Sequence, residues 1–199
     1  MKKSQFDDEN FVAMSQNPQV SSVLQGCKHL YTSNPPSPLN DSQSEYVVQT
    51  IKHFFDKFII VQYSILNTLE DHILSDVKLK VSNVESLYQL KLHSVVHLDD
   101  SESIKYNEKK YVYAVLTKQD CEHPFPQGKV TQKLAIKITE IDVDSKDELG
   151  SYDEDYALEP MHILVKDYLT TASLPSGQFK GIWDTIGADP KVSETTNNF

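Results

Sequence analysis

The sequence contains no arginine, and all 19 of its basic side chains are lysines. A protein without arginine has no bidentate guanidinium clamp for phosphate and no arginine finger. The formal net charge is −10 at pH 7. Nucleic acids and anionic membrane surfaces bind basic faces of proteins, so the acidic balance argues against both as direct ligands.

Cysteine and glycine are also scarce. The two cysteines, Cys27 and Cys121, fall in unlike regions of the chain, which argues against a disulfide framework and fits a reducing, cytosolic setting. No G-x-S-x-G motif occurs, and the spacing of the six glycines excludes G-x-G-x-x-G and the P-loop. The nucleophile and nucleotide motifs of common enzymes are therefore missing, and an enzyme is the least favoured class of function.

The longest apolar run is Phe54–Leu66. It is rich in β-branched and aromatic residues, which suit a packed, pleated surface better than a helix. Asp56 and Lys57 interrupt it, and it is too short to span a membrane. We interpret it as containing the central strand of a β-sandwich.

Period-two alternation of apolar and polar residues recurs from Glu45 onward, with turn residues between the segments. About seven strands of this kind, with no long helical period between them, predict an all-β, immunoglobulin-like sandwich over residues 45–170. The predicted strands are Tyr46–Ile51, Lys57–Leu66, Val77–Val81, Tyr88–Leu92, Tyr111–Val115, Leu134–Ile138 and Met161–Val165.

The two ends of the chain differ from this middle part. Residues 1–44 are rich in Ser, Asn, Gln and Pro, which predicts a disordered linker. An apolar island at Val20–Tyr31 has two interpretations, incidental hydrophobicity or a short docking peptide. In the tail, Phe179, Ile182, Trp183 and Ile186 have helical spacing, which predicts a short C-terminal helix within residues 171–199.

Acidic residues cluster between the sixth and seventh predicted strands. The cluster comprises Asp142, Asp144, Asp147, Glu148, Asp153, Glu154, Asp155 and Glu159. Aligned with the EF-hand pattern from Asp142, the sixth position is Asp147 where glycine is needed, so the calcium interpretation fails. We expect a solvated hairpin loop instead. Solvent leaves the pKa values of such paired carboxylates ordinary, so the loop offers no general acid.

A zinc site is the other metal hypothesis. Cys121 and His123, with His93 and His97, match none of the usual zinc spacings. We therefore expect no metal and no cofactor.

Three segments resemble the gamma subunit of coatomer, the coat of Golgi-derived vesicles. Ser42–Val48 with Lys52-His53 and Leu66–Leu69 is similar to the family's entry into its appendage domain. Ser151–Glu159 is similar to its acidic loop and following strand. Phe179–Gly187 is similar to the F-x-x-x-W-D-x-x-G segment where the second appendage subdomain begins. The resemblance covers about Leu24 to Gly187, and the composition suggests a fungal member.

The resemblance implies an appendage made of an immunoglobulin-like sandwich and an α/β platform. It implies a non-enzymatic interaction module that recruits coat regulators for Golgi–ER vesicle transport. The implied partners are other coatomer subunits and an Arf GTPase-activating protein, and the implied location is cytoplasmic, peripheral on Golgi membranes and vesicles through the coat. Trp183 matches the partner-site tryptophan of the platform. Because the sequence ends at Phe199, residues 171–199 are expected to be the start of a truncated platform.

Other functions stay open on the sequence. Trp183 has a second interpretation, as an anchor that packs the short helix onto neighbouring structure. The sandwich also has a second interpretation, as a structural spacer without a partner of its own. A clathrin-adaptor-type appendage is a close relative of the favoured interpretation, and a metal-binding or hydrolytic domain is the third class.

Overall fold

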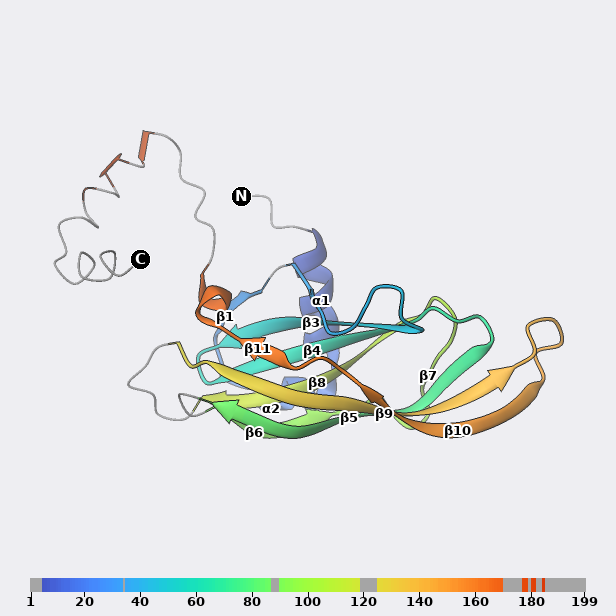
Figure 1. The fold of residues 1–199 in the computed structure, drawn as a ribbon. Coiled ribbons are helices and arrows are strands. Elements are labelled where there is room, and N and C mark those ends of the chain that lie inside the picture. Colours follow the sequence, from blue (N-terminus) through green and yellow to red (C-terminus); the bar gives the residue numbers. More distant parts are fainter. Residues whose placement is uncertain are drawn as a thin grey trace. The chain divides into compact units, whose positions relative to one another are not determined.

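The computed structural model describes residues 5–33, 35–86, 90–118 and 125–169, with the backbone alone at 5–9. It also describes Gly177, Gln178, Lys180, Gly181 and Asp184, all with helical backbone. The chain divides into two units, Lys3–Tyr168 and a second unit that contains Leu169–Phe199 with Met1–Lys2. The first unit is a β-sandwich (Figure 1).

The sandwich consists of two antiparallel sheets, sheet A and sheet B. Sheet A has the order β1 (His29–Thr32), β3 (Tyr46–Phe55), β4 (Phe58–Asn67), β8 (Lys109–Lys118), β6 (Leu90–Val96), and β2 (Ser37–Pro38) pairs with β3. Sheet B has the order β10 (Glu148–Ala157), β9 (Gly128–Ile141), β5 (His72–Ser86), β7 (Ser103–Ile104), and β11 (Met161–Ile163) pairs with β9. The all-β sandwich predicted from the sequence is confirmed.

Strand β4 is the central strand of sheet A and buries both of its faces. Ile59, Val61, Tyr63 and Ile65 belong to the main core between the sheets. Ile60 belongs to a second core cluster on the opposite face. This dual burial explains why β4 appears as an almost continuous apolar run in the sequence. Asp56 and Lys57 make the turn between β3 and β4.

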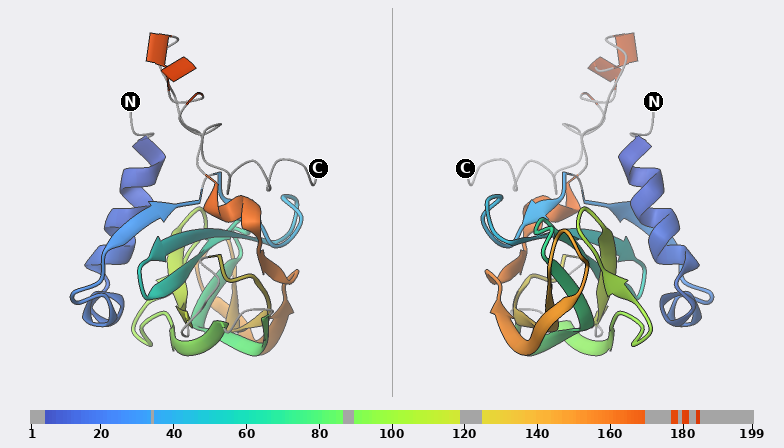
Figure 2. Two further views of the ribbon diagram at one scale, coloured as in Figure 1. Left: turned by 90° about the vertical axis from the view of Figure 1, so that its left-hand side faces the viewer. Right: turned by 90° about the vertical axis from the view of Figure 1, so that its right-hand side faces the viewer.

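Two N-terminal helices cover the outer face of sheet A (Figure 2). Helix α1 (Gln5–Gln16) contributes Met14 and helix α2 (Pro18–Val23) contributes Val20, and both side chains are fully buried. Asn17 caps α2, because its Oδ1 accepts hydrogen bonds from the backbone N–H groups of Gln19 at 3.0 Å and Val20 at 3.1 Å. Pro18 in the first turn needs no N–H partner.

The expectation of a disordered linker at residues 1–44 is wrong for the part of this segment that the structure describes. It forms α1, α2, β1 and β2. The sparse apolar residues suffice because they pack on an existing sheet face rather than on each other. Within the Val20–Tyr31 island, Val20 packs on sheet A and Tyr31 stacks on Phe54 with ring centroids 4.6 Å apart. The island therefore docks on the fold of its own chain.

Several strands differ from their predicted extents. The acidic segment Glu148–Ala157 is strand β10 rather than loop, because its backbone pairs with β9 even though its side chains are largely exposed. The seventh predicted strand ends at Ile163, and the four-residue 3-10 helix η1 (Val165–Tyr168) follows it. The predicted strand at Tyr88–Leu92 begins at Leu90 in the described residues, as β6.

The predicted C-terminal helix lies largely outside the described residues, as do Phe179, Ile182, Trp183 and Ile186. Among the helices that the structure describes, none is both long and apolar enough to cross a lipid bilayer.

The outer-face cluster of sheet A generates the first prediction. In Ile60→Asp an unpaired carboxylate would replace a fully buried side chain of this cluster. Burial of an unpaired charge is among the costliest single changes, so we expect loss of the cooperative unfolding transition in urea. Val12→Asp, at a 46% exposed position of α1, is the control and should change the free energy of unfolding by only about 0.5 kcal/mol. Native-like unfolding of Ile60→Asp would mean that the cluster is not packed.

A second prediction concerns two buried tyrosines of the main core. The hydroxyl of Tyr63 has no hydrogen-bond partner among the described residues, whereas the hydroxyl of Tyr46 lies 2.7 Å from His72 Nδ1. Removal of an unsatisfied buried hydroxyl relieves a desolvation cost. Tyr63→Phe should therefore leave the melting temperature unchanged or raise it, and the control Tyr46→Phe should lose about 1 kcal/mol of stability.

Burial also raises the pKa of Tyr63 above its ordinary value of 10.0. The folded state therefore holds the Tyr63 proton more tightly than the unfolded state does. Ionisation of this group leaves stability unchanged below that pH and lowers it as the pH rises towards the higher pKa of the folded state. Tyr63→Phe should therefore lose less stability than wild type as the pH rises above 10.0, which melting temperatures measured across this range would show. An identical alkaline profile for wild type and variant would contradict the burial of this hydroxyl.

Candidate functional site

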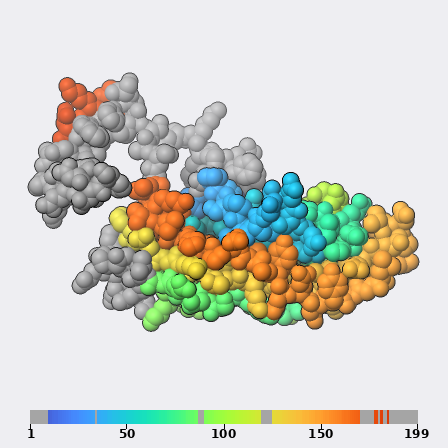
Figure 3. Space-filling model, viewed as in Figure 1, coloured from blue at the N-terminus to red at the C-terminus, as the bar shows by residue number. Residues whose placement is uncertain are grey.

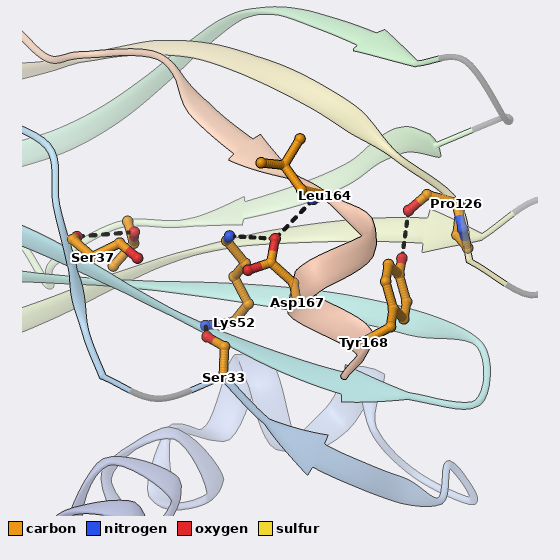
Figure 4. Close-up of polar contacts among 8 residues, drawn as sticks. Ser33, Ser37, Lys52, Pro126, Leu164, Asp167 and Tyr168 are labelled. Carbon is orange, nitrogen blue, oxygen red and sulfur yellow. Dashed lines mark hydrogen bonds and ion pairs between the residues drawn. The ribbon is translucent and has the colours of Figure 1, made fainter. Parts of the chain in front are cut away.

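A buried ion pair joins η1 to sheet A. Lys52 Nζ on β3 lies 2.7 Å from Asp167 Oδ2, and the two side chains are 6% and 10% exposed (Figure 4). The same carboxylate oxygen accepts a hydrogen bond from the backbone N–H of Leu164 at 2.8 Å. Asp167 thus holds its own 3-10 helix in shape and attaches it to β3.

The backbone around Lys52 ties a third segment to the same place. Its N–H donates to Ser33 Oγ at 2.9 Å, and its carbonyl accepts from the N–H of Ser33 at 2.8 Å. Ser33 directly follows β1, so it extends the pairing of that strand with β3. The entry and exit segments of the sandwich therefore converge on β3 (Figure 4).

Aromatic rings seal this attachment. The ring of Tyr168 lies 4.7 Å from that of Phe54, 5.3 Å from that of Phe125 and 6.3 Å from that of Tyr31. The Tyr168 hydroxyl donates a hydrogen bond to the carbonyl of Pro126. Ring pairs at these separations add to the free energy of area burial.

Burial sets the electrostatics of the pair. It lowers the pKa of Lys52, and the hydrogen bond and charge of Asp167 oppose that shift. A buried ammonium is tolerable only with such a partner. The pair is thus a structural attachment, and its enclosed side chains do not present a surface to a partner.

A second charged site is exposed on the outer face of sheet B. Asp155 Oδ2 lies 2.7 Å from Lys133 Nζ, and Asp155 Oδ1 lies 3.1 Å from Lys80 Nζ. Hydrogen bonds from these two ammonium groups lower the pKa of Asp155. A shallow depression of about 440 Å³ lies along this face and is lined by Asp76, Lys78, Lys80, Ala135, Ile136, Lys137, Asp153, Glu154 and Asp155. The alternation of both signs makes this face polar.

The acidic turn between β9 and β10 is a compact structural turn. Asp142 Oδ1 accepts hydrogen bonds from the backbone N–H groups of Asp144 at 2.9 Å and Ser145 at 2.8 Å. These bonds lower the pKa of Asp142. The expected hairpin loop is therefore present, but it is shorter than predicted and leads into β10.

The histidines of the zinc hypothesis have other roles. His97 Nδ1 accepts a hydrogen bond from the N–H of Leu79 at 3.2 Å, and burial lowers its pKa. The ring of His93 packs edge-on against that of Phe58 at 5.5 Å. Cys121 and His123 lie outside the described residues. In the described part of the chain, no group of three or more His, Cys, Asp and Glu side chains is placed to hold a metal ion.

The predicted partner residue, Trp183, also lies outside the described residues, so its role stays a prediction. Sequence reasoning missed the Lys52–Asp167 pair. A signal for it does exist, because Lys52 shares its strand face with the core residues Val48 and Phe54. A lysine in an inward register requires a partner.

Comparison with known proteins identifies a family whose model matches most of this chain. Residues 13–164 match the family model described as the coatomer gamma subunit appendage platform subdomain. The match therefore begins inside α1 and covers α2 and both sheets. It ends before residues 171–199, which were expected from the sequence to begin the platform.

Full-length relatives show the same similarity. The chain is 28% identical over 181 residues to coatomer subunit gamma-2 of Danio rerio, which is 89% of this chain and 20% of that protein. It is 27% identical over 168 residues to coatomer subunit gamma-2 of Homo sapiens, which is 83% of this chain and 18% of that protein. For coatomer subunit gamma of Drosophila pseudoobscura pseudoobscura the identity is 27% over 161 residues, 80% and 17% of the two chains. The chain thus spans about a fifth of the length of these relatives.

The buried ion pair yields a prediction on stability. Lys52→Met leaves the buried Asp167 carboxylate unpaired, and Asp167→Asn leaves the buried Lys52 ammonium unpaired. Each variant should therefore lose about 3–5 kcal/mol of unfolding free energy. The double variant should lose less than the sum of the two, because neither charge is then left unpaired. Urea denaturation measures all three values.

An exposed ion pair provides the matched control. Lys110 Nζ lies 2.8 Å from Glu102 Oε1, with side chains 37% and 42% exposed. Breaking it should cost about 1 kcal/mol at most. Additive losses at Lys52 and Asp167 would contradict the ion pair as the attachment of η1.

Proposed function

The chain belongs to the coatomer gamma appendage platform family, and on this premise we propose that it is a non-enzymatic protein-interaction module of a vesicle coat. Its work is to present surfaces to other proteins rather than to transform a substrate. The observation that carries the proposal is the family match over residues 13–164, which takes in most of the sandwich and its helical layer.

The finer parts of the proposal concern partners and place. The partners are other coatomer subunits and regulators of the coat, among them an Arf GTPase-activating protein, in Golgi–ER vesicle transport. The module is cytoplasmic and is held at Golgi membranes and vesicles through the rest of the coat. Its formal net charge of −10 supports an indirect attachment, because anionic lipid surfaces attract basic faces.

The segment after the sandwich has a role of its own in this proposal. Residues 171–199 begin a further part of the appendage, and Trp183 is its partner contact. A tryptophan is well suited to this role, because it combines a large apolar area with one polar N–H and is enriched at interface hot spots.

The alternative is a structural spacer that merely holds neighbouring parts of the coat apart. The same sandwich serves that purpose, since η1 and β1 are both tied to β3 and so fix the chain where it enters and leaves. A spacer has no specific partner, which separates it from the interaction module by a binding experiment. Family membership favours a coatomer appendage over a clathrin-adaptor appendage.

The experiment immobilises residues 1–199 and passes cytosol over the matrix. We expect retention of coatomer subunits and an Arf GTPase-activating protein, measured by mass spectrometry against an empty matrix. Trp183→Ala should reduce retention of the regulator by about ten-fold, which corresponds to a loss of about 1.4 kcal/mol of binding free energy. Tyr106→Ala is the control, because Tyr106 is an aromatic residue of the β7–β8 loop that is 46% exposed. This variant should retain the regulator as well as wild type does.

Specific retention of no coat component would favour the spacer. Retention that is the same for wild type and Trp183→Ala would remove the tryptophan from the proposal and leave the sandwich as the binding part.

A further inference from the structure

Strand β10 is a terminal strand of sheet B, and in the part of the chain that the structure describes no strand pairs with its outer edge, called the free edge below. Residues Glu148–Ala157 pair with β9 on one side. Among the described residues, no backbone hydrogen bond outside that ladder involves this strand. In an antiparallel pair every second residue of an edge strand directs its N–H and C=O away from the neighbour, so β10 presents a row of unused donors and acceptors.

This edge is long and open to solvent. Eight of the ten residues of β10 are exposed, and only Glu154 and Tyr156 are half-buried. The hairpin of β9 and β10 runs out to one end of the sandwich, where its atoms lie at the molecular surface (Figures 1 and 3).

Apolar side chains stand beside the free edge. Leu149 is 67% exposed and Tyr152 is 45% exposed, both on β10, and Val143 in the preceding turn is 40% exposed. Exposed apolar residues on an unpaired edge strand form contacts for alternate side chains of an added strand.

The charge carried by β10 itself is negative, while Lys78, Lys80 and Lys137 lie beside it on the outer face. Strand β10 contains Glu148, Asp153, Glu154 and Asp155 and no basic residue. Lys80 and Lys133 neutralise Asp155 on the outer face. Of the other carboxylates of β10, Glu154 lies near Tyr152, together with Glu140, Glu45 and Asp71 from neighbouring segments. Desolvation and then these four charges raise the pKa of Tyr152. A peptide that pairs with this edge gains most if it carries positive charge.

The same charges disfavour a second copy of the chain as occupant. Antiparallel pairing of two β10 edges would set acidic strand against acidic strand. Like charges directly opposite each other in a sheet are destabilising. Pairing of two copies of the chain through this edge is therefore disfavoured, whereas pairing with a basic strand is not.

We propose that the free edge of β10 binds a lysine- or arginine-rich extended segment of a partner protein by β-strand addition. The main-chain hydrogen bonds of the added strand supply affinity, and the carboxylates near Tyr152 select for basic residues. This inference rests on the proposed function, because it names a surface and a partner chemistry for the interaction module.

A simpler role for the acidic residues is protection of the edge against aggregation, which charged edge strands provide in many proteins. Protection against aggregation requires only that the acidic residues repel the edge strands of other molecules. It predicts no saturable binding of a basic peptide and no change in the backbone of β10, so the two roles separate by experiment.

The test uses a fluorescently labelled ten-residue peptide of alternating lysine and valine, titrated into the chain of residues 1–199 and followed by anisotropy. We expect saturable binding. A peptide of the same sequence with N-methyl groups on its central residues keeps its charge but cannot pair as a strand. It should bind at least ~10-fold more weakly if two or more backbone hydrogen bonds are lost.

Charge-reversal variants test the selectivity. Glu148→Lys/Glu154→Lys should weaken binding of the peptide ~10-fold, since each changed charge lies at the edge. Asp100→Lys/Glu108→Lys changes the net charge equally and is the control, because both residues are exposed and flank β7, at the opposite edge of sheet B. This control should bind as wild type does.

Hydrogen exchange gives the structural readout. The outward N–H groups of residues 148–157 should exchange rapidly in the free chain and more slowly with the peptide bound. Equal binding of the plain and N-methylated peptides, unchanged exchange in β10, or dimerisation of the free chain in sedimentation analysis would each overturn the proposal. Retention of coat components by a chain that binds no basic peptide would overturn this inference and leave the proposed function intact.

Discussion

Sheet A must bury both of its faces, and the rest of the structure depends on this requirement. One face packs on sheet B, and the other carries Ile60, Tyr113 and Val115, which would meet water without the helices. Met14 and Val20 cover them. The N-terminal segment is thus part of the domain, which agrees with a family match that begins at residue 13.

The covered face of sheet A also holds polar groups. His53 is fully buried, with Nε2 2.7 Å from Gln62 Oε1 and Nδ1 3.0 Å from Thr32 Oγ1. Thr32 Oγ1 in turn lies 3.1 Å from His29 Nε2, and the ring of Phe11 in α1 packs 4.6 Å from the His29 ring. This polar chain fixes β1 and α1 against β3 and β4 more specifically than apolar contact alone does, because hydrogen bonds are directional.

The sequence predicts the strands whose burial leaves a clear apolar pattern. Strand β9 is predicted because its alternate side chains meet the core, and β4 and β8 because residues buried on both faces form apolar runs. Strand β10 was not predicted, because its backbone pairs with β9 while its acidic side chains are exposed and leave no apolar pattern in the sequence. Helix α2 was detectable, because Asn17-Pro18 is a cap followed by a first-turn proline. Lys52 alone signals a buried partner, but its identity as Asp167 depends on the tertiary fold. The free edge is equally invisible in the sequence, because it follows from strand order.

The short turn at Asp56 and Lys57 implies an order of folding events. It joins β3 to β4, which are sequence neighbours, so this hairpin closes a small loop at low entropic cost. The pairing of β5 with β9 joins segments that are far apart in the chain and requires a large loop to close first. Once formed, the β3–β4 hairpin offers one face to the helices that precede it and the other to sheet B. The amino-terminal half of the sandwich is therefore expected to serve as the template on which the later strands assemble.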